Sequence, residues 1–600
     1  MTELIWEGKY DKDGHKVAPR RVGLPFQTVE TVNESSQERQ EALDLFGRGR
    51  ETEWRNRLIW GDNKYVLPAL LDEFAGKVDL VYIDPPFATG QDFSYTATVA
   101  GHEFEKVPSL IEQKAYRDTW GAGFDSYLQL MSDRLLLLRE LLSPRGSIFV
   151  HLDAHMGPYV KVLLDELFGR DNFQNQIAWY YYNKLHGASK RLIPKAFDVI
   201  LYYVKDRNSE YTYHTLSEPR DKPVKKLKYR FIDGKITNLK DESGKTITYV
   251  STERQLDNVW RIRCLQPADL EEWVNFPTQK PVDLIERLLQ VASNEGDLVL
   301  DAFCGSGTTM VAAERQGRRW IGVDLGRYAI HTARKRLLSE PGLKPFVVQN
   351  LGKYERQLWQ TTEFGDEARA RTAAYRRFIL DMYKAKPIEG HVWLHGIKQG
   401  RLVHVGTVDA PVTVGDVKQI ATEFRRAIGT GKDAPTSKAV DVLGWDFAFE
   451  LNEIARQEAD RAGIEVHFWR IPREVLDKRT VDEGDVRFFE LAALAVEAKR
   501  QGRKVDVRLT DFMIPLDDVP QDVQSGITEW AQWIDYWAID WDNKGDAFHN
   551  EWQTYRSRKE PRLLKEANHE YSEQGEYQVV VKVIDILGND TTKTIRVEVL

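Results

Sequence analysis

DLVLDAFCGSGTTMVAAERQGRRWIGVD, residues 297–324, is the stretch that decides the fold class of this chain of 600 residues. Residues 297–303 are apolar enough for a buried strand, and residues 307–317 place apolar side chains at helical spacing. A second apolar run follows at 319–324. A strand, a turn, a helix and a second strand form a βαβ unit, whose two strands lie parallel in one sheet.

The same alternation continues on both sides of this stretch. Further strands are expected at 78–83 and 147–152, and further helices at 66–74, 128–142, 160–169, 281–292 and 327–338. We therefore predict an α/β fold, a Rossmann-like doubly wound sheet with helices on both faces.

The turn of the βαβ unit has the composition of a loop that binds a nucleoside. Gly305 and Gly307 permit a tight turn and leave room for a ligand at the start of the next helix. Asp324 ends the next strand, where a carboxylate can accept hydrogen bonds from ribose hydroxyls. The lysine that a P-loop requires after its last glycine is absent. A nucleoside-containing cofactor is predicted, and a tight turn without a ligand is the alternative.

A second motif, Asp84-Pro85-Pro86-Phe87, ends the strand expected at 78–83. Two consecutive prolines cannot continue a ladder of hydrogen bonds, so the chain leaves the sheet rigidly. The Asp84 carboxylate and the Pro85 carbonyl are acceptors for an exocyclic amino group, and the Phe87 ring can stack on a planar base. The motif suits a base taken out of its stack, whereas an ordinary turn is the alternative interpretation.

Together the two motifs resemble those of amino-group DNA methyltransferases. DPPFATGQDFSY (84–95) resembles their catalytic motif, and AFCGSGTT (302–309) is similar to their S-adenosylmethionine loop. NFPTQKP (275–281) looks like the segment that precedes this loop. The catalytic motif comes first, which is the order of the β class, and the similarity covers about residues 56–345. Phe87 stands where tyrosine is commoner and Ala302 where proline is usual, and both differences are compatible with the class.

The resemblance implies a role for each matching residue. The catalytic residues would be Asp84, Pro85, Pro86 and Phe87. The cofactor, S-adenosylmethionine, would be bound by Asp62, Thr278, Lys280, Asp301, Phe303, Gly305, Gly307, Thr308 and Asp324. Asp62 is equally suited to cap the helix that follows it.

The implied reaction is the transfer of a methyl group to N6 of a flipped adenine, without a covalent enzyme intermediate. Asp rather than Ser at the start of the motif favours adenine, and transfer to N4 of cytosine is the alternative. A solitary epigenetic methylase is the alternative to a restriction-modification or phage-defence enzyme.

The region between the two motifs, residues 172–272, would hold an inserted target-recognition region. Over residues 184–230, lysine and arginine outnumber aspartate and glutamate by twelve to five, and tyrosines are interleaved. Basic side chains for phosphates and rings for bases suit a DNA surface. The residues expected to bind DNA are Lys184, Lys190, Arg191, Lys195, Lys225, Lys226, Lys228 and Arg230. The alternative is a solvated basic surface whose tyrosines lie in a strand core.

The rest of the chain suggests accessory units. We expect an N-terminal surface arm (1–55), the methyltransferase domain (56–365), an α/β accessory domain (366–525) and a small β-sandwich that resembles a PKD domain (526–600). The size and the catalytic run are similar to modification subunits of type III restriction systems. Double-stranded DNA, a helicase or restriction subunit, and a second copy of the chain in a homodimer are therefore the expected partners.

Composition excludes several classes of protein. The net charge of −8 is unlike that of chains that bind nucleic acid by bulk charge. Two cysteines cannot form a disulfide framework and suit a cytoplasmic location, and neither a membrane segment nor a metal-ligand pattern is found. A nucleotide-binding oxidoreductase would leave Asp84–Phe87 without a role. The intact catalytic motif argues against a catalytically inactive DNA-binding subunit.

Overall fold

We describe the protein from a computed structural model. The structure describes residues 3–35, 54–86, 95–99, 102–106, 124–184, 193–232, 235–427, 437–448, 463–476, 488–515, 521–545, 547–557 and 559–600, and positions 38, 459, 461 and 486. None of the helices in these residues is long and apolar enough to cross a membrane.

The centre of the molecule is an eleven-stranded mixed sheet. Its strands are β1 (Gln27–Val32), β2 (Asn56–Trp60), β3 (Val78–Ile83), β6 (Leu142–Leu152), β7 (Phe173–Tyr180), β8 (Phe197–Val204), β13 (Val259–Arg261), β14 (Leu298–Asp301), β15 (Arg319–Asp324), β16 (Phe346–Asn350) and β26 (Phe548–Asn550). Their order across the sheet is β13-β7-β8-β6-β3-β14-β15-β2-β16-β1-β26. The six neighbours from β6 to β16 run parallel, which confirms the predicted doubly wound α/β class.

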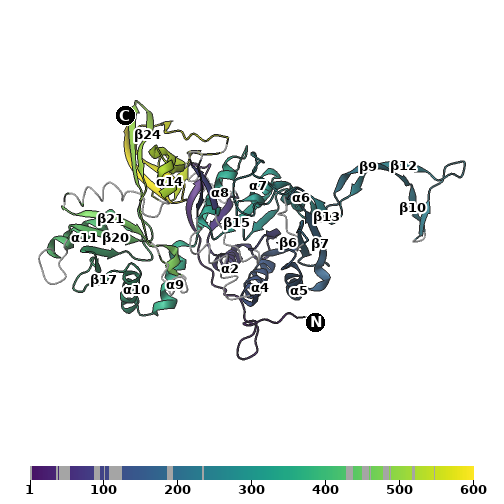
Figure 1. The fold of residues 1–600 in the computed structure, drawn as a ribbon, viewed down its shortest axis with the longest axis horizontal. Helices are drawn as coiled ribbons and strands as arrows, with labels where there is room; N and C mark the ends of the chain where they lie inside the picture. Colours follow the sequence, from purple (N-terminus) through teal and green to yellow (C-terminus); the bar gives the residue numbers. More distant parts are fainter. Residues whose placement is uncertain are drawn as a thin grey trace.

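Helices cover both faces of this sheet (Figure 1). One face packs against α2 (Asn63–Phe74), α4 (Phe124–Leu141) and α5 (Gly157–Phe168). The other packs against α6 (Val282–Ala292), α7 (Thr308–Arg315) and α8 (Arg327–Leu338). Strand β3 shows why both faces need a cover. Val81 and Ile83 belong to the first core and Leu80 and Tyr82 to the second, because successive side chains of a strand point to opposite faces.

The N-terminal segment is more than the expected surface arm. Residues 27–32 form β1, which lies between β16 and β26 in the central sheet, and its Val32 is fully buried. Trp6 belongs to the first core. The expectation for residues 1–55 is therefore wrong for these parts. The polar sequence of β1 conceals its burial, since Glu30 is fully buried against Lys582 (2.6 Å) and Arg334 (3.1 Å).

The region predicted as an insertion, 172–272, contributes strands to the central sheet. β7 and β8 form an antiparallel pair there, and Tyr181, Tyr202 and Tyr203 are buried in the two cores. For these tyrosines, the strand-core alternative is confirmed and the DNA surface is wrong.

Only the middle of this region projects from the body, as the ribbon arm, residues 217–255 (Figure 1). Its two-stranded pairs are β9 (Ser217–Leu227) with β12 (Thr248–Gln255), and β10 (Tyr229–Ile232) with β11 (Lys235–Asn238). A separate short hairpin joins β4 (Tyr95–Val99) to β5 (His102–Lys106).

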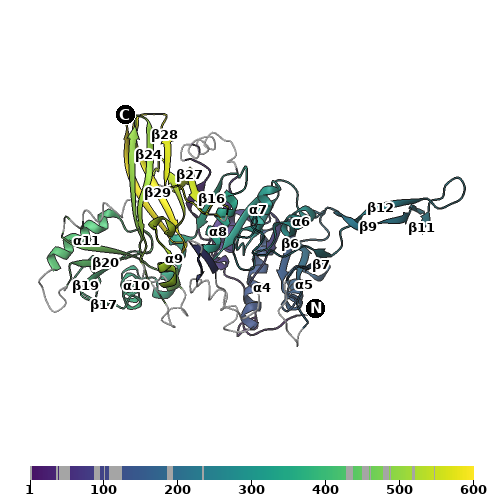
Figure 2. The same cartoon turned by 45° about the horizontal axis from the view of Figure 1, so that its top comes forward.

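The C-terminal part of the chain forms the two expected accessory units, which Figure 2 shows at the end of the molecule opposite the ribbon arm. Helices α9 (Gly352–Phe364) and α10 (Ala368–Met382) lead into a six-stranded sheet that packs against α11 (Val414–Ala427). The strands of this sheet are β17 (Lys386–Pro387), β18 (Gly396–Lys398), β19 (Arg401–Val405), β20 (Ala439–Gly444), β21 (Glu465–Arg470) and β22 (Phe489–Glu490). A short 3-10 helix, η2 (Arg473–Leu476), follows β21.

Two further sheets share one core and make the predicted β-sandwich. One sheet contains β23 (Ala493–Gln501), β24 (Lys504–Met513) and β28 (Glu566–Glu570), and the other contains β25 (Ile534–Asp540), β27 (Trp552–Tyr555), β29 (Gly575–Asp585) and β30 (Asp590–Val599). A short helix, α14 (Gln521–Gly526), connects the two. The sandwich therefore begins at β23 and not at residue 526. It is also joined to the central sheet, because β26 pairs with β1.

Candidate active site

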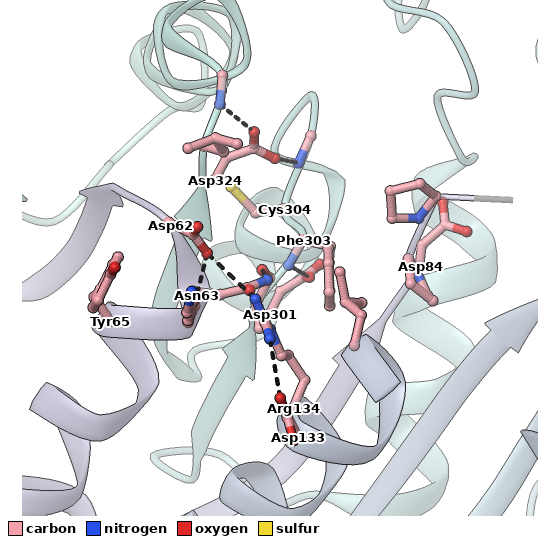
Figure 3. Close-up of a pocket in the computed structure, with 18 of the residues that line it drawn as sticks. Asp62, Asn63, Tyr65, Asp84, Asp133, Arg134, Asp301, Phe303, Cys304 and Asp324 are labelled. Atoms are coloured by element: carbon pink, nitrogen blue, oxygen red, sulfur yellow. Dashed lines mark hydrogen bonds and ion pairs between the residues drawn. The ribbon is translucent and has the colours of Figure 1, made fainter. Parts of the chain in front are cut away.

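A cavity of 720 Å³ lies at the carboxyl ends of the central parallel strands. Asp62 follows β2, Asp84 follows β3, Asp301 ends β14 and Asp324 ends β15, and all four line the cavity (Figure 3). Ligands of doubly wound sheets bind outside this edge, because the connecting loops diverge there. The fold thus brings together residues from both sequence motifs.

Eight of the nine residues predicted to bind the cofactor line this cavity, and Gly307 does not. Gly307 has φ of 83°, and a Cβ atom there would lie 2.8 Å from the Cβ of Ala333. This glycine is required by its backbone conformation and by the close approach of α8. The structure thus gives Gly307 a packing role, and its contact with the cofactor stays a prediction.

Asp324 fixes the shape of the glycine loop. Its Oδ2 accepts a hydrogen bond from the Gly305 N–H at 2.8 Å, and its Oδ1 accepts one from the Gly326 N–H at 2.8 Å. Each carboxylate oxygen can accept a further hydrogen bond. The carboxylate can thus hold the loop and still present acceptors to a ligand.

Asp301 lies behind the loop and is almost completely buried. It accepts hydrogen bonds from the Phe303 N–H at 3.0 Å and from the Thr309 hydroxyl at 2.5 Å. Burial is the largest influence and raises the pKa of Asp301 to about 7, against the effect of these two hydrogen bonds. The loop is therefore anchored at both ends by a carboxylate.

Asp84 and Lys280 form an ion pair inside the cavity. Lys280 Nζ donates to Asp84 Oδ2 and, at 3.1 Å, to the Thr278 carbonyl. The second oxygen, Asp84 Oδ1, is buried and has no hydrogen-bond partner among the residues that the structure describes. The resemblance assigned Lys280 to the cofactor, and the structure places its ammonium group on the Asp84 carboxylate.

The other residues of the catalytic motif fall into two groups. Pro85 and Pro86 line the cavity beside Asp84. Phe87, predicted to stack on the base, lies outside the described residues.

Asp62 caps helix α2, as one of its two sequence interpretations predicts. Its Oδ1 accepts a hydrogen bond from the Lys64 N–H at 2.8 Å and lies 3.5 Å from Arg134 Nη2. Arg134 also donates to Asn63 Oδ1 at 2.9 Å, and Asn63 in turn donates to the Ala302 carbonyl at 3.0 Å.

Sequence reasoning missed Arg134 and Asn63, which connect α4 to the glycine loop. Arg134 is only 7% exposed although it lies within the apolar face of α4. A charged residue at an apolar helical position was the available signal, because buried arginines are almost always paired.

Thr308 supports the loop from behind. Its hydroxyl donates to the Lys280 carbonyl at 3.2 Å and accepts from Arg336 Nη1 at 2.8 Å. Arg336 Nη1 also donates to the Ser306 carbonyl at 3.1 Å. The segment that carries Lys280 is thereby tied to the start of α7.

The residues expected to bind DNA lie in two places. Lys184 lies over the ring of Tyr181, with its Nζ 4.9 Å from the ring centroid, and Lys195 Nζ lies 3.8 Å from Asp153. Four others are exposed along the ribbon arm: Lys225, Lys226, Lys228 and Arg230. Lys190 and Arg191 lie outside the described residues.

Across the part of the chain that the structure describes, no group of three or more His, Cys, Asp or Glu side chains could hold a metal ion.

Comparison with known proteins matches the part of the sequence that contains both motifs. Residues 78–335, which contain both motifs, match a family model described as DNA methylase. The chain contains a DNA methylase domain. Type II methyltransferase M.EcaI of Enterobacter cloacae is 29% identical to this chain over 349 residues, which are 50% of this chain and 73% of that protein.

Two further relatives of the methylase domain are informative. DNA adenine methyltransferase YhdJ of Escherichia coli (strain K12) is 27% identical over 266 residues, covering 44% of this chain and 77% of that protein. The Mod subunit of the type III restriction-modification enzyme StyLTI, of Salmonella typhimurium, is 25% identical over 327 residues, covering 42% of this chain and 49% of that protein. The residues beyond 335 lie outside the family match.

Proposed function

We propose that the methylase domain transfers a methyl group from S-adenosylmethionine to N6 of adenine in double-stranded DNA. One observation carries this proposal: Asp84 has one oxygen paired with Lys280, and its other oxygen is buried without a hydrogen-bond partner among the described residues. A buried acceptor without a donor costs about 1–3 kcal/mol, which a bound N–H group would offset. The exocyclic amino group of adenine supplies such a donor, and both Asp84 and Lys280 lie within the residues that match the DNA methylase model.

The cavity suits S-adenosylmethionine. Carboxylates outnumber cationic side chains in its lining, which favours a cationic ligand. Asp324 presents acceptors for the ribose, and Asp62 presents an acceptor at the far end for the adenine amino group. When bound, this cofactor supplies a methyl group already activated by a sulfonium centre.

The side chains of the domain orient and activate the amine. Asp84 Oδ1 and the Pro85 carbonyl accept hydrogen bonds from the two N–H groups of the amine. These bonds favour a tetrahedral nitrogen with an available lone pair. The ammonium group of Lys280 pairs with Asp84 Oδ2 and fixes the rotamer of Asp84. Positioning a nucleophile in this way accelerates a transfer by many orders of magnitude without a covalent intermediate.

Adenine is favoured over cytosine by the aspartate that begins the motif and by the likeness to YhdJ, which is named as a DNA adenine methyltransferase. A base must leave the duplex to reach a cavity at the strand ends, so the target adenine is flipped. The ribbon arm supplies phosphate contacts through Lys225, Lys226, Lys228 and Arg230. A restriction-modification role, with a restriction subunit as partner, is supported by the likeness to the StyLTI Mod subunit.

The test is methylation of plasmid DNA with labelled S-adenosylmethionine, followed by mass spectrometry of the released nucleosides. We expect N6-methyladenine with the wild-type protein and none with Asp84→Ala. The control is Asp165→Asn, which removes a carboxylate paired with Lys161 at 2.8 Å on α5, away from the cavity, and should retain activity. N4-methylcytosine as the sole product would refute the adenine assignment, and activity of Asp84→Ala would refute the catalytic role.

A further inference from the structure

The wall of the cofactor cavity extends beyond the family match. Leu358 and Trp359 of α9 line the cavity, as do Arg473 and Leu476 of η2. Helix η2 follows β21 of the accessory sheet, so its residues belong to a different unit from the methylase domain. A unit without an assigned task therefore contributes surface to the pocket.

This accessory wall lies at the Asp62 end of the cavity. Tyr65, in the first turn of α2, has its pKa raised mainly by burial and also by the carboxylates of Asp62 and Glu355. Arg473 is one of two nearby cations that oppose this rise in the pKa of Tyr65. Figure 3 shows Tyr65 and Asp62 on one side of the glycine loop and Asp84 on the other. The wall is thus remote from the reacting end.

A bidentate ion pair joins the two parts of the wall. Arg473 Nη2 lies 2.6 Å from Glu355 Oε1 and 2.7 Å from Oε2. The side chains are 19% and 12% exposed, so the pair is largely screened from water. The Arg473 guanidinium also lies 5.8 Å from the ring centroid of Trp60, at the end of β2.

The position of α9 is in turn set by the accessory domain. Next to Glu355, Arg356 Nη2 lies 2.6 Å from Asp446, and its Nε donates to the Val408 carbonyl at 2.9 Å. Trp359 makes an edge contact with Trp445, at 6.2 Å between ring centroids. These contacts hold α9, and with it this side of the cavity, against the accessory domain.

We propose that the accessory α/β domain completes the adenosine side of the cofactor pocket, with Arg473 as a positioning residue that locks η2 onto α9. The inference rests on the proposed function, since it assumes that the cavity binds S-adenosylmethionine. Cofactor affinity then depends on docking of this domain. A macromolecule that binds the docked form more tightly must therefore tighten cofactor binding. By linkage, the cofactor must tighten binding of that macromolecule by the same factor.

The experiment measures the dissociation constant of S-adenosylmethionine by calorimetry on the full chain without DNA. We expect Arg473→Ala to weaken binding roughly tenfold, within the range of coupling between sites, and Arg473→Lys to recover part of it. KM for the cofactor should rise with kcat unchanged at saturating cofactor, because Asp84 lies at the other end of the cavity.

The matched control is Arg425→Ala, which removes an exposed arginine of α11 in the same accessory domain but outside the cavity wall. It should leave cofactor affinity unchanged. Leu476→Ala is the second test, since it removes a wall contact without breaking an ion pair, and it should also weaken binding.

Unchanged affinity in folded Arg473→Ala or Leu476→Ala, or equal loss in Arg425→Ala, would overturn the inference. These outcomes differ from failure of the proposed function, in which the wild-type chain itself would not bind S-adenosylmethionine.

Discussion

Replacing Gly307 with alanine tests how the glycine loop is held. At φ of 83°, an alanine is in the left-handed region, which costs about 1–2 kcal/mol. Its Cβ would also lie 2.8 Å from the Cβ and 2.9 Å from the Cα of Ala333, on the facing helix α8. Overpacking of this kind costs about 1–3 kcal/mol, so Gly307→Ala should lose about 2–5 kcal/mol in total.

The control for backbone strain is Gly296→Ala. Gly296 has φ of 81° and precedes β14, and a Cβ atom there would meet nothing within 4 Å. It should lose only the backbone part, about 1–2 kcal/mol. The difference between the two variants isolates the contact with α8.

A double-mutant cycle with Ala333→Gly locates the clash. Removing the Ala333 methyl group relieves part of the contact, so the two substitutions should be less destabilising together than their sum predicts. The assay is thermal unfolding of the four proteins of the cycle and of Gly296→Ala. Since about 1 kcal/mol shifts the melting temperature of a domain by about 2–4 °C, Gly307→Ala should melt about 2–12 °C below Gly296→Ala. Equal melting of the two glycine variants, or strict additivity in the cycle, would refute the packing role.

Three other predictions follow from named contacts. Asp301→Asn should become stabilising relative to wild type as pH rises from about 4 to 7, because burial raises the folded-state pKa of Asp301 to about 7. In this range the carboxyl group is ionised in the unfolded chain and protonated in the folded protein, so the wild type loses stability as pH rises. The gain should reach about 4 kcal/mol by thermal unfolding across this pH range, and a pH-independent difference would contradict it. Lys225→Glu with Lys226→Glu should weaken DNA binding and lower the slope of log affinity against log salt by about 2, and an unchanged slope would remove the arm from the DNA contact. Lys582→Ala should cost about 3–5 kcal/mol of stability in chemical denaturation, because it leaves Glu30 buried with one cation fewer, and a neutral effect would show that Arg334 alone suffices.

The local sequence pattern was sufficient for the central fold. The strand expected at 78–83 is β3 to the residue, and the helix expected at 327–338 is α8. Both segments bury side chains with a clear period, so their structure is encoded within a few residues. The meeting of Asp62, Asp84, Asp301 and Asp324 was equally predictable, because parallel strands end at one edge of a sheet.

Contacts between distant segments were not predictable in this way. The pairing of Lys280 with Asp84 joins residues 196 apart, and that of Lys582 with Glu30 joins residues 552 apart. Periodicity carries no information on which distant charge will neutralise a buried carboxylate. The polar sequence of β1 for this reason suggested a surface arm, although its glutamate is buried.

The sequence by itself thus determined the doubly wound sheet, the order of its motifs and the residues at the strand ends, because each depends on local period and chain direction. Tertiary structure alone decided that Lys280 pairs with the Asp84 carboxylate, that Gly307 packs against α8, and that Arg473 reaches the cavity from another domain. Each of these depends on how complementary surfaces dock in three dimensions, where burial makes charge pairing and close packing decisive.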